Sequence, residues 1–257
     1  MSNQFNRRRV LARLVASLGA LPLAGCDFFS DNASVRNVLD RAESLTMAAQ
    51  RLLLSRHALA QEFTEADIST HFRANGSTDP DDDAYQILAQ SGFKDWRLQV
   101  DGLVQSPLQL SLDDLRAFPA RTQITRHDCV EGWSCIGKWT GVPLSMVLQR
   151  AGLKPDAKYI VFYCADSLGG YLDQNKYYES IDLIDAFHPQ TILAYDMNGA
   201  PLETPYGAPL RVRIERQLGY KMAKYIMRIE AVESFRHIGA GRGSYWADRN
   251  YEWYAGI

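Results

Sequence analysis

The alternation of short strands and short helices after residue 95 constrains the fold more than any other feature of this sequence. Apolar and polar residues alternate over 96–100, which predicts a strand with one buried face. A Ser-x-x-Asp capping box predicts a short helix over 111–118. Because no regular strand–helix–strand repeat is present, we predict an α+β fold of mixed sheets with short helices. Further strands are predicted over 122–127, 159–164, 210–214 and 225–232, and a helix over 143–151 ending at Gly152.

The first 25 residues are typical of an export signal. Arg7, Arg8 and Arg9 precede an apolar run over 14–25, which is too short to span a bilayer and fits a signal peptide. Residues 6–11 resemble a twin-arginine signal, and residues 23–26 resemble a bacterial lipobox. We therefore expect export to the periplasm, cleavage before Cys26 and a lipid on Cys26 that anchors the protein to the membrane. The competing interpretation is a basic N-terminus before a core helix.

Three parts are expected along the chain. Residues 1–25 form the signal, 26–69 a lipid-anchored helical segment, and 70–257 the functional domain. Apolar residues recur at helical spacing between 31 and 62, which predicts one long N-terminal helix whose apolar stripe packs on the domain. The stretch over 70–83 is rich in Gly and Asp and predicts a loop.

Charge and cysteine content narrow the functional classes. The formal net charge is −2, so no basic field suggests a nucleic-acid partner. Once Cys26 is assigned to the lipobox, Cys129, Cys135 and Cys164 remain. An odd number of cysteines in an oxidising compartment means that at least one thiol is free or bound to another group.

Three segments carry the chemistry of the sequence. The first is Cys-Val-Glu-Gly-Trp-Ser over 129–134, the second Gly-Ala-Pro-Leu-Arg over 207–211, and the third Gly-Tyr-Lys-Met-Ala-Lys over 219–224. In this order the blocks resemble the molybdopterin-dependent oxidoreductases with the sulfite-oxidase fold. The nearer branch is similar to the periplasmic methionine sulfoxide reductase catalytic subunits. The resemblance covers roughly residues 70–232.

The resemblance implies a molybdenum-molybdopterin cofactor and assigns roles to individual residues. Cys129 matches the thiolate ligand of molybdenum. Two residues depart from the family pattern: Tyr206 stands where the family has an Asn cofactor contact, and Cys164 where it has a Thr in the metal pocket. The remaining cofactor contacts that the resemblance implies are Arg73, Asn75, Arg211, Met222, Ala223 and Lys224.

The chemistry of these side chains agrees with the implied roles. A cysteine thiolate is the soft anionic donor that such a metal accepts, and cations at Arg126, His127 and Lys138 are expected to lower its pKa. Arg211 offers a bidentate fork for a phosphate, and Lys224 adds a point charge.

Other interpretations of the same residues stay open. His127 with the three cysteines forms a Cys3His zinc set, although the usual Cys-x2–4-Cys spacing is absent. Cys135 and Cys164 are core residues or a disulfide pair. The whole domain is alternatively a cofactor-free lipoprotein that uses the fold for binding.

We predict an enzyme that moves an oxygen atom and two electrons, most simply by reducing an S-oxide such as methionine sulfoxide. The alternative is oxidation of a small sulfur compound, as in sulfite oxidases. Those enzymes carry Asn-Arg-Arg after the ligand cysteine, where this chain has Val130-Glu131-Gly132. We also expect a monomer, because little chain follows residue 232, and a membrane haem protein or cytochrome as the electron partner.

Overall fold

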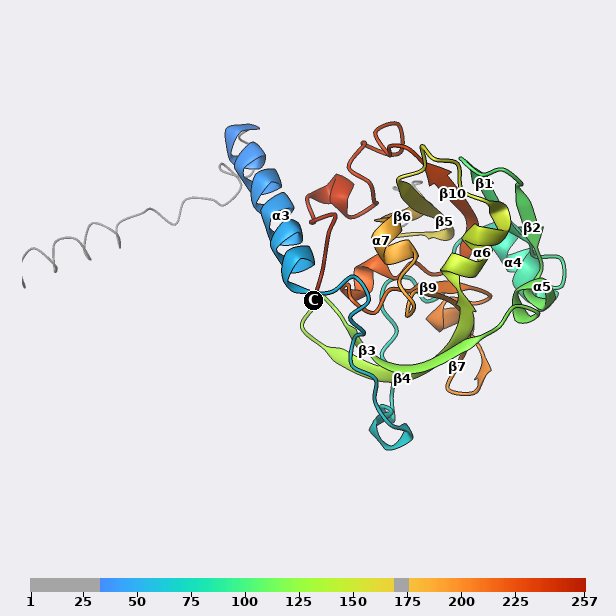
Figure 1. Ribbon diagram of the computed structural model, residues 1–257. Coiled ribbons are helices and arrows are strands. Elements are labelled where there is room, and N and C mark those ends of the chain that lie inside the picture. The colour runs from blue at the N-terminus through green and yellow to red at the C-terminus, as the bar shows by residue number, and fades with distance from the viewer. Residues whose placement is uncertain (1–32, 169–175) are drawn as a thin grey trace, which may run out of the picture. The chain divides into compact units, whose positions relative to one another are not determined.

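The computed structural model describes residues 33–168 and 176–257 (Figure 1). The predicted export signal, including the arginines at 7–9 and Cys26, lies outside the described residues. The chain divides into a unit that ends at Ala48 and a unit from Ala49 to Ile257, and the fold below is that of the second unit. In the described part of the chain, no helix is long and apolar enough to cross a bilayer.

The N-terminal helix α3 (Ala33–Leu53) ends earlier than residue 62, where the sequence analysis placed its end. Leu52 and Leu53 are 86% and 83% exposed, so the predicted packing of the apolar stripe is wrong at these two positions. The chain then leaves the helix and hydrogen bonds to a sheet: the amide of Phe63 donates to Ile124 (2.8 Å). The domain boundary at residue 70 stays a prediction.

Sheet A is built around a long hairpin of β3 (Arg121–Asp128) and β4 (Ser134–Pro143). Its order is β3-β4-β7-β8, with β7 at Ile192–Met197 and β8 at Ala200–Pro201. The short strand β9 (Arg211–Arg213) also pairs with β7. All these pairings are antiparallel.

Sheet B has the order β2-β1-β10-β5-β6. Its single parallel pair joins β1 to β10, and the other pairs are antiparallel. Such mixed sheets confirm the predicted α+β class. The strands are β1 (Leu98–Gly102), β2 (Leu108–Leu110), β5 (Tyr159–Ser167), β6 (Lys176–Asp182) and β10 (Ile226–Val232).

Short helices connect the strands. In α5 (Leu112–Arg116) the predicted capping box is present, since Ser111 and Asp114 hydrogen bond reciprocally. Gly152 ends α6 (Leu144–Ala151) with a positive φ of 69°, as predicted. The others are α4 (Asp83–Gln90), α7 (Leu183–Ala186), η1 (Glu65–Asp67), η3 (Thr204–Tyr206), η4 (Gly219–Lys221) and η5 (Ala247–Arg249).

The main core joins side chains of the two sheets to α6. Leu98 and Phe162 of sheet B and Leu193 of sheet A are fully buried within one apolar cluster. A second cluster around Phe72 and Trp139 packs on sheet A. Burial of these side chains is the main favourable term for the fold, at about 1.5–3 kcal/mol for each large side chain.

Candidate active site

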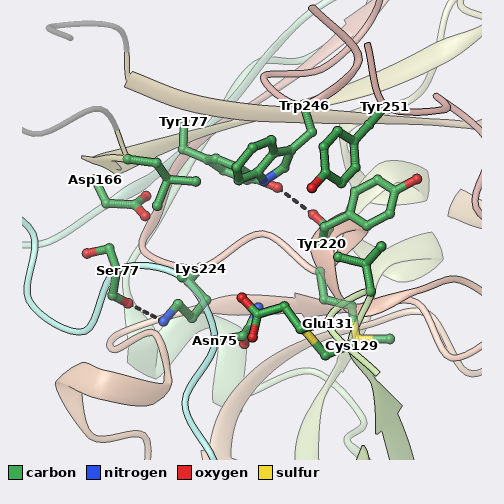
Figure 2. A pocket seen from close by; sticks show the side chains of 14 residues that line it. Asn75, Ser77, Cys129, Glu131, Asp166, Tyr177, Tyr220, Lys224, Trp246 and Tyr251 are labelled. Atoms are coloured by element: carbon green, nitrogen blue, oxygen red, sulfur yellow. Dashed lines mark hydrogen bonds between the residues drawn. The ribbon is translucent and has the colours of Figure 1, made fainter. Parts of the chain in front are cut away.

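A pocket with an empty volume of ≈ 680 Å³, which includes the space at its mouth, lies beside the turn between β3 and β4. Figure 2 shows Cys129, Glu131, Asn75 and Lys224 on one side and aromatic rings on the other. The lining residues are Asn75, Gly76, Ser77, Cys129, Val130, Glu131, Asp166, Leu168, Tyr177, Tyr220, Met222, Lys224, Trp246 and Tyr251.

The β3–β4 turn fixes the backbone of Cys129. Its amide donates to the carbonyl of Trp133 (2.9 Å), and its carbonyl accepts from the amide of Gly132 (3.0 Å). Gly132 has a φ of 84°, a left-handed conformation that glycine adopts without a steric cost. The thiol of Cys129 is free and lines the pocket, so it is available to a ligand there.

The surroundings of Cys129 raise the pKa of its thiol. Burial is the largest cause and the charge of Glu131 adds to it, while Arg73 opposes them. The prediction that neighbouring cations lower this pKa is therefore wrong. Arg126 pairs with Asp128 at 2.8 Å and Lys138 pairs with Glu65, so both charges are compensated elsewhere. A bound metal ion would supply the positive charge that keeps the sulfur deprotonated.

His127, the third expected cation, is uncharged in this fold. Strand alternation turns its ring into the interior, where burial and the nearby Arg213 and Arg211 lower its pKa well below the usual value. A guanidinium nitrogen of Arg213 donates to Nδ1 at 3.0 Å, so the proton of the neutral ring is on Nε2. That Nε2 atom has no hydrogen-bond partner among the described residues.

Arg211 is buried with an incomplete set of hydrogen bonds. It is 1% exposed, and one guanidinium nitrogen donates to the carbonyl of Tyr206 at 2.9 Å. Nε and the second terminal nitrogen find no partner in the described part of the chain. Burial and the neighbouring Arg213 lower the pKa of Arg211 to about 9. Buried donors of this kind are normally satisfied, so their lack of a partner points to a missing ligand.

Lys224 is the second buried cation of the site. It is 5% exposed, and its ammonium donates to the carbonyls of Ser77 and Pro205. Burial and the charge of Arg211 lower the pKa of Lys224 to about 7. Gly207 lies against both cations: an added Cβ would be 2.9 Å from Cβ of Lys224 and 3.2 Å from Cβ of Arg211. Two adjacent buried cations, neither with a carboxylate within 4 Å in the described residues, suit an anion such as a phosphate.

Two further polar groups of the pocket lack partners. Oδ1 of Asn75 and Oδ1 of Asp166 are buried without hydrogen bonds to the described residues. Burial raises the pKa of Asp166 to about 6, against the opposing charge of Lys224. These two oxygen atoms would accept hydrogen bonds from the N–H groups of a heterocycle. Together with the free donors of Arg211 and the thiol of Cys129, they fit a cofactor that combines a soft metal, a heterocycle and a phosphate.

The pocket unites four of the residues that the sequence analysis singled out: Asn75, Cys129, Met222 and Lys224. The other five lie elsewhere. Ala223 and Cys164 belong to the main core, and Arg211 is buried beneath Trp139, 4.8 Å from the ring centre. Arg73 is exposed, and Tyr206 donates its hydroxyl to Phe72 at 3.1 Å. The cofactor roles of all nine residues stay predictions.

The three described cysteines are separate. Cys129, Cys135 and Cys164 all carry free thiols, so the alternative of a Cys135–Cys164 disulfide is not realised. Cys135 lies on β4 in sheet A, and Cys164 lies on β5 in sheet B. Within residues 33–168 and 176–257, no three His, Cys, Asp or Glu side chains are arranged to hold a metal ion, so the Cys3His zinc set is not assembled.

The sequence analysis missed Asp166 and the four aromatic rings of the pocket. Tyr177 and Tyr220 come from β6 and η4, and Trp246 and Tyr251 from the C-terminal tail. The richness of the tail in Trp and Tyr was the available signal. It could not be assigned to the pocket, because it is distant in sequence from the cysteine.

Comparison with known proteins identifies the relatives of this fold and site. Residues 85–237 match the family described as an oxidoreductase molybdopterin binding domain. The putative protein-methionine-sulfoxide reductase subunit YedZ1 of Azospira oryzae is 38% identical, over 97% of this chain and 87% of the relative. The protein-methionine-sulfoxide reductase catalytic subunit MsrP of Xanthomonas campestris pv. campestris is 33% identical, over 89% of this chain and 71% of the relative.

A solved structure supports the same fold. The sulfane dehydrogenase SoxCD of Paracoccus pantotrophus is 22% identical, with a TM-score of 0.50 over 74% of this chain. The match spans about half of that structure's chain, 52%. The predicted sulfite-oxidase-like fold is thus confirmed, as is a molybdenum-molybdopterin cofactor that the orphaned polar groups of the pocket suit. The chain belongs to the oxidoreductases with a molybdopterin-binding domain.

Proposed function

We propose that the protein reduces the S-oxide of a methionine side chain or a similar thioether. In this reaction the S-oxide takes up two protons and two electrons and leaves as thioether and water. The observation that carries the proposal is the charge beside Cys129. Glu131 lines the pocket, and the guanidinium of Arg73 pairs with its carboxylate at 3.6 Å, so this pair leaves no net positive charge next to Cys129. An anion such as sulfite would need such a charge, whereas a neutral S-oxide would not.

The relatives support this substrate class. Two proteins that each match at least 89% of this chain are named as protein-methionine-sulfoxide reductase subunits. Their names also support a substrate that is part of a protein. Activity on an S-oxide would require an electron donor, and we propose a membrane haem protein or a cytochrome for this role.

Different residues would hold different parts of the cofactor. We propose that the sulfur of Cys129 is the protein ligand of molybdenum, and that Arg211 and Lys224 hold the phosphate. Asn75, Met222 and Ala223 would contact the pterin, and Arg73, Cys164 and Tyr206 are further contacts that the resemblance implies. When bound, the cofactor supplies a metal centre that accepts an oxygen atom and exchanges two electrons.

Asp166 would add a proton store to this site. Its pKa of about 6 lies close to neutral pH, so the carboxyl group can hold and release a proton within the pocket. S-oxide reduction consumes two protons, and a group poised in this range is suited to their delivery.

The cellular setting is proposed from the N-terminal motifs. The arginines at 7–9 and the lipobox ending at Cys26 support twin-arginine export, lipid attachment and a periplasmic location. Export in the folded state suits a cofactor that is inserted in the cytoplasm. We further propose that the protein is a monomer.

The test is to express the protein with its own signal, purify it from the membrane fraction, and measure bound molybdenum and pterin. S-oxides and N-oxides are then assayed with a reduced dye, and sulfite with an oxidised dye. We expect near-stoichiometric metal and turnover of methionine sulfoxide in peptides. Oxidation of sulfite without S-oxide reduction would contradict the proposed direction. If the purified protein lacks near-stoichiometric molybdenum, the interpretation of a cofactor-free binding protein is favoured.

The ligand role of Cys129 is tested by Cys129→Ser with Cys135→Ser as a matched control. Both thiols are free and half-buried, and Cys135 does not line the pocket. We expect Cys129→Ser to remain folded and lose activity, because the other proposed cofactor contacts are spread over several elements. Wild-type turnover in Cys129→Ser would refute the assignment.

A further inference from the structure

We propose that four aromatic side chains of the pocket, Tyr177, Tyr220, Trp246 and Tyr251, form the substrate-binding wall and select a neutral thioether S-oxide. We call these residues the aromatic wall. The inference rests on the proposed function and deepens it, because it assigns substrate recognition to residues of which all but Tyr220 lie outside the three sequence blocks.

Three rings of the aromatic wall, those of Tyr220, Trp246 and Tyr251, contact one another on one side of the pocket. Trp246 and Tyr251 have ring centroids 4.9 Å apart, and Tyr220 meets Tyr251 at 5.5 Å in an edge-to-face geometry. In Figure 2 these rings lie across the pocket from Asn75, Lys224 and Cys129. The pocket thus has one side that suits a cofactor and one that suits an uncharged, polarisable group.

Two hydroxyl groups of the wall are turned toward the backbone. Tyr177 donates its hydroxyl to the carbonyl of Tyr220, and Tyr220 donates its own to the carbonyl of Glu252 at 2.8 Å. The polar ends of these two residues are therefore engaged within the protein, and all four wall residues line the pocket.

The part of the wall that comes from the tail is held in a fixed place. The hydroxyl of Tyr178 on β6 donates to Asp248 at 2.6 Å, and the amides of Ala240 and Arg242 donate to the same carboxylate at 2.8 and 3.2 Å. The amide of Tyr245 donates to the carbonyl of Tyr178 at 2.9 Å. These bonds fix the segment that carries Trp246, so the wall is a built surface.

The chemistry of the wall specifies what it would bind. A thioether sulfur packs favourably against aromatic rings. Charged groups lose hydration against such a surface without compensation. The wall would therefore accept the methyl and methylene groups of a methionine side chain, while the S-oxide oxygen faces the polar side with Asn75 and Lys224. Free methionine sulfoxide, which carries two charges, would bind less well than the same residue in a peptide.

The test compares Trp246→Leu and Tyr251→Leu with Trp246→Phe, which keeps a ring, and with Phe187→Leu. Phe187 is an exposed aromatic residue, 38% exposed, that does not line the pocket. Holoenzymes with equal molybdenum content are assayed on N-acetylmethionine sulfoxide methyl ester and on free methionine sulfoxide. Binding of the unreactive thioether N-acetylmethionine methyl ester is measured by calorimetry.

We expect the two Leu variants to raise the KM for the ester and the Kd for the thioether about 3–10-fold, with kcat within about twofold of wild type. The preference for the ester over the free amino acid falls by the same factor. Phe187→Leu stays within about twofold, and Trp246→Phe, which keeps a ring, raises both constants less than Trp246→Leu. Unchanged KM and Kd in both Leu variants, or a loss of kcat at unchanged Kd, would overturn the inference.

A second measurement does not depend on the folding of the Leu variants. Saturation with the thioether ester should change the tryptophan emission of the wild-type holoenzyme, and Trp246→Phe should abolish this change. An emission that stays constant at saturation overturns the inference. Thioether binding at the wall without S-oxide turnover would defeat the proposed function and leave the wall standing. S-oxide turnover that is unchanged by substitutions in the wall would support the proposed function and overturn the inference about the wall.

Discussion

Gly219 packs directly against the imidazole of His127, so that a Cβ atom at position 219 would lie 2.3 Å from Nε2 of the ring. Gly219 begins η4, which leads directly into Met222 and Lys224. The ring of His127 is fully buried between Phe72 and Trp133, at centroid distances of 5.9 and 5.6 Å, and has little room to move. Close contact between these two residues positions the third sequence block against the first.

Gly219→Ala should therefore destabilise the protein by about 1–3 kcal/mol through overpacking and reduce the amount of bound pterin. Urea unfolding and fluorescence of the released pterin measure the two effects. In the double variant with His127→Ala, the cost should be less than the sum of the single variants, because the smaller residue makes room for the methyl group. If the two destabilisations are fully additive, the contact between Gly219 and His127 does not determine the space available at position 219.

Arg211 and Arg213 are neighbouring buried arginines, and we expect their replacement by Met to change the stability of the cofactor-free protein in different ways. Arg213 pairs with Glu215 at 2.7 Å, whereas Arg211 has no carboxylate partner within 4 Å in the described residues. In the cofactor-free protein, Arg211→Met should be neutral or stabilising, since it removes an uncompensated charge. Arg213→Met should cost about 3–5 kcal/mol, since it leaves the buried Glu215 carboxylate without its paired cation, with a hydrogen bond from Gln123 at 2.8 Å remaining. Thermal unfolding compares the two, and equal destabilisation would contradict an anion site at Arg211. Pterin content should fall in Arg211→Met.

The stability of the cofactor-free protein should rise with pH above neutrality. The folded pKa of Lys224 is about 7, below the unfolded value of 10.5, so the unfolded chain binds one more proton in this window. The free energy of unfolding should then rise between about pH 7 and 9 by up to about 1.4 kcal/mol per pH unit, below the range in which Arg211, with a pKa of about 9, adds a slope of its own. Lys224→Met should remove this slope, as seen in urea unfolding at several pH values. A phosphate group bound at Lys224 should also flatten the dependence of the free energy of unfolding on pH. A slope that persists in Lys224→Met would exclude this residue as the source of the pH dependence.

Asp166 should oppose stability at neutral pH before the cofactor binds. Its folded pKa of about 6 exceeds the unfolded value of 3.8, so its favourable contribution is complete below about pH 4 and is lost as the pH rises through 6. At pH 7, Asp166→Asn should therefore stabilise the cofactor-free protein by about 1–3 kcal/mol. Asp156→Asn, at an exposed position, serves as the control and should change little. Destabilisation by Asp166→Asn would show that the carboxylate has a compensating partner.

The holoenzyme should show a related pH dependence in turnover. If Asp166 delivers a proton, the rate of S-oxide reduction should fall as the pH rises above about 6, and this limb should be absent in Asp166→Asn. Steady-state rates from pH 5 to 9 provide the test. An identical profile in the variant would assign the proton to solvent or to another group.

Much of the fold could be predicted from the sequence, because it depends on interactions between residues that are close together in the chain. The capping box at Ser111, the helix stop at Gly152 and the alternation over 96–100 each depend on residues a few positions apart, and all three elements form. The strands β4, β6 and β7 and the helix α4 were not predicted. Long-range pairing defines β7, which lies between β4 and β9. Strands β6 and β7 are mostly buried, so their sequences lack the alternation that a half-exposed strand shows.

The sequence alone determined the family, the cofactor and the identity of the candidate ligand, because the three blocks around Cys129, Arg211 and Lys224 are linear patterns. Only the tertiary structure decided the electrostatics of the site. It paired Arg126 and Lys138 with carboxylates, left Arg211 without one, and buried Asp166. It also brought the rings of the C-terminal tail to the pocket. Charge and burial depend on which groups surround a residue in space, and those groups come from strands and loops far apart in the chain.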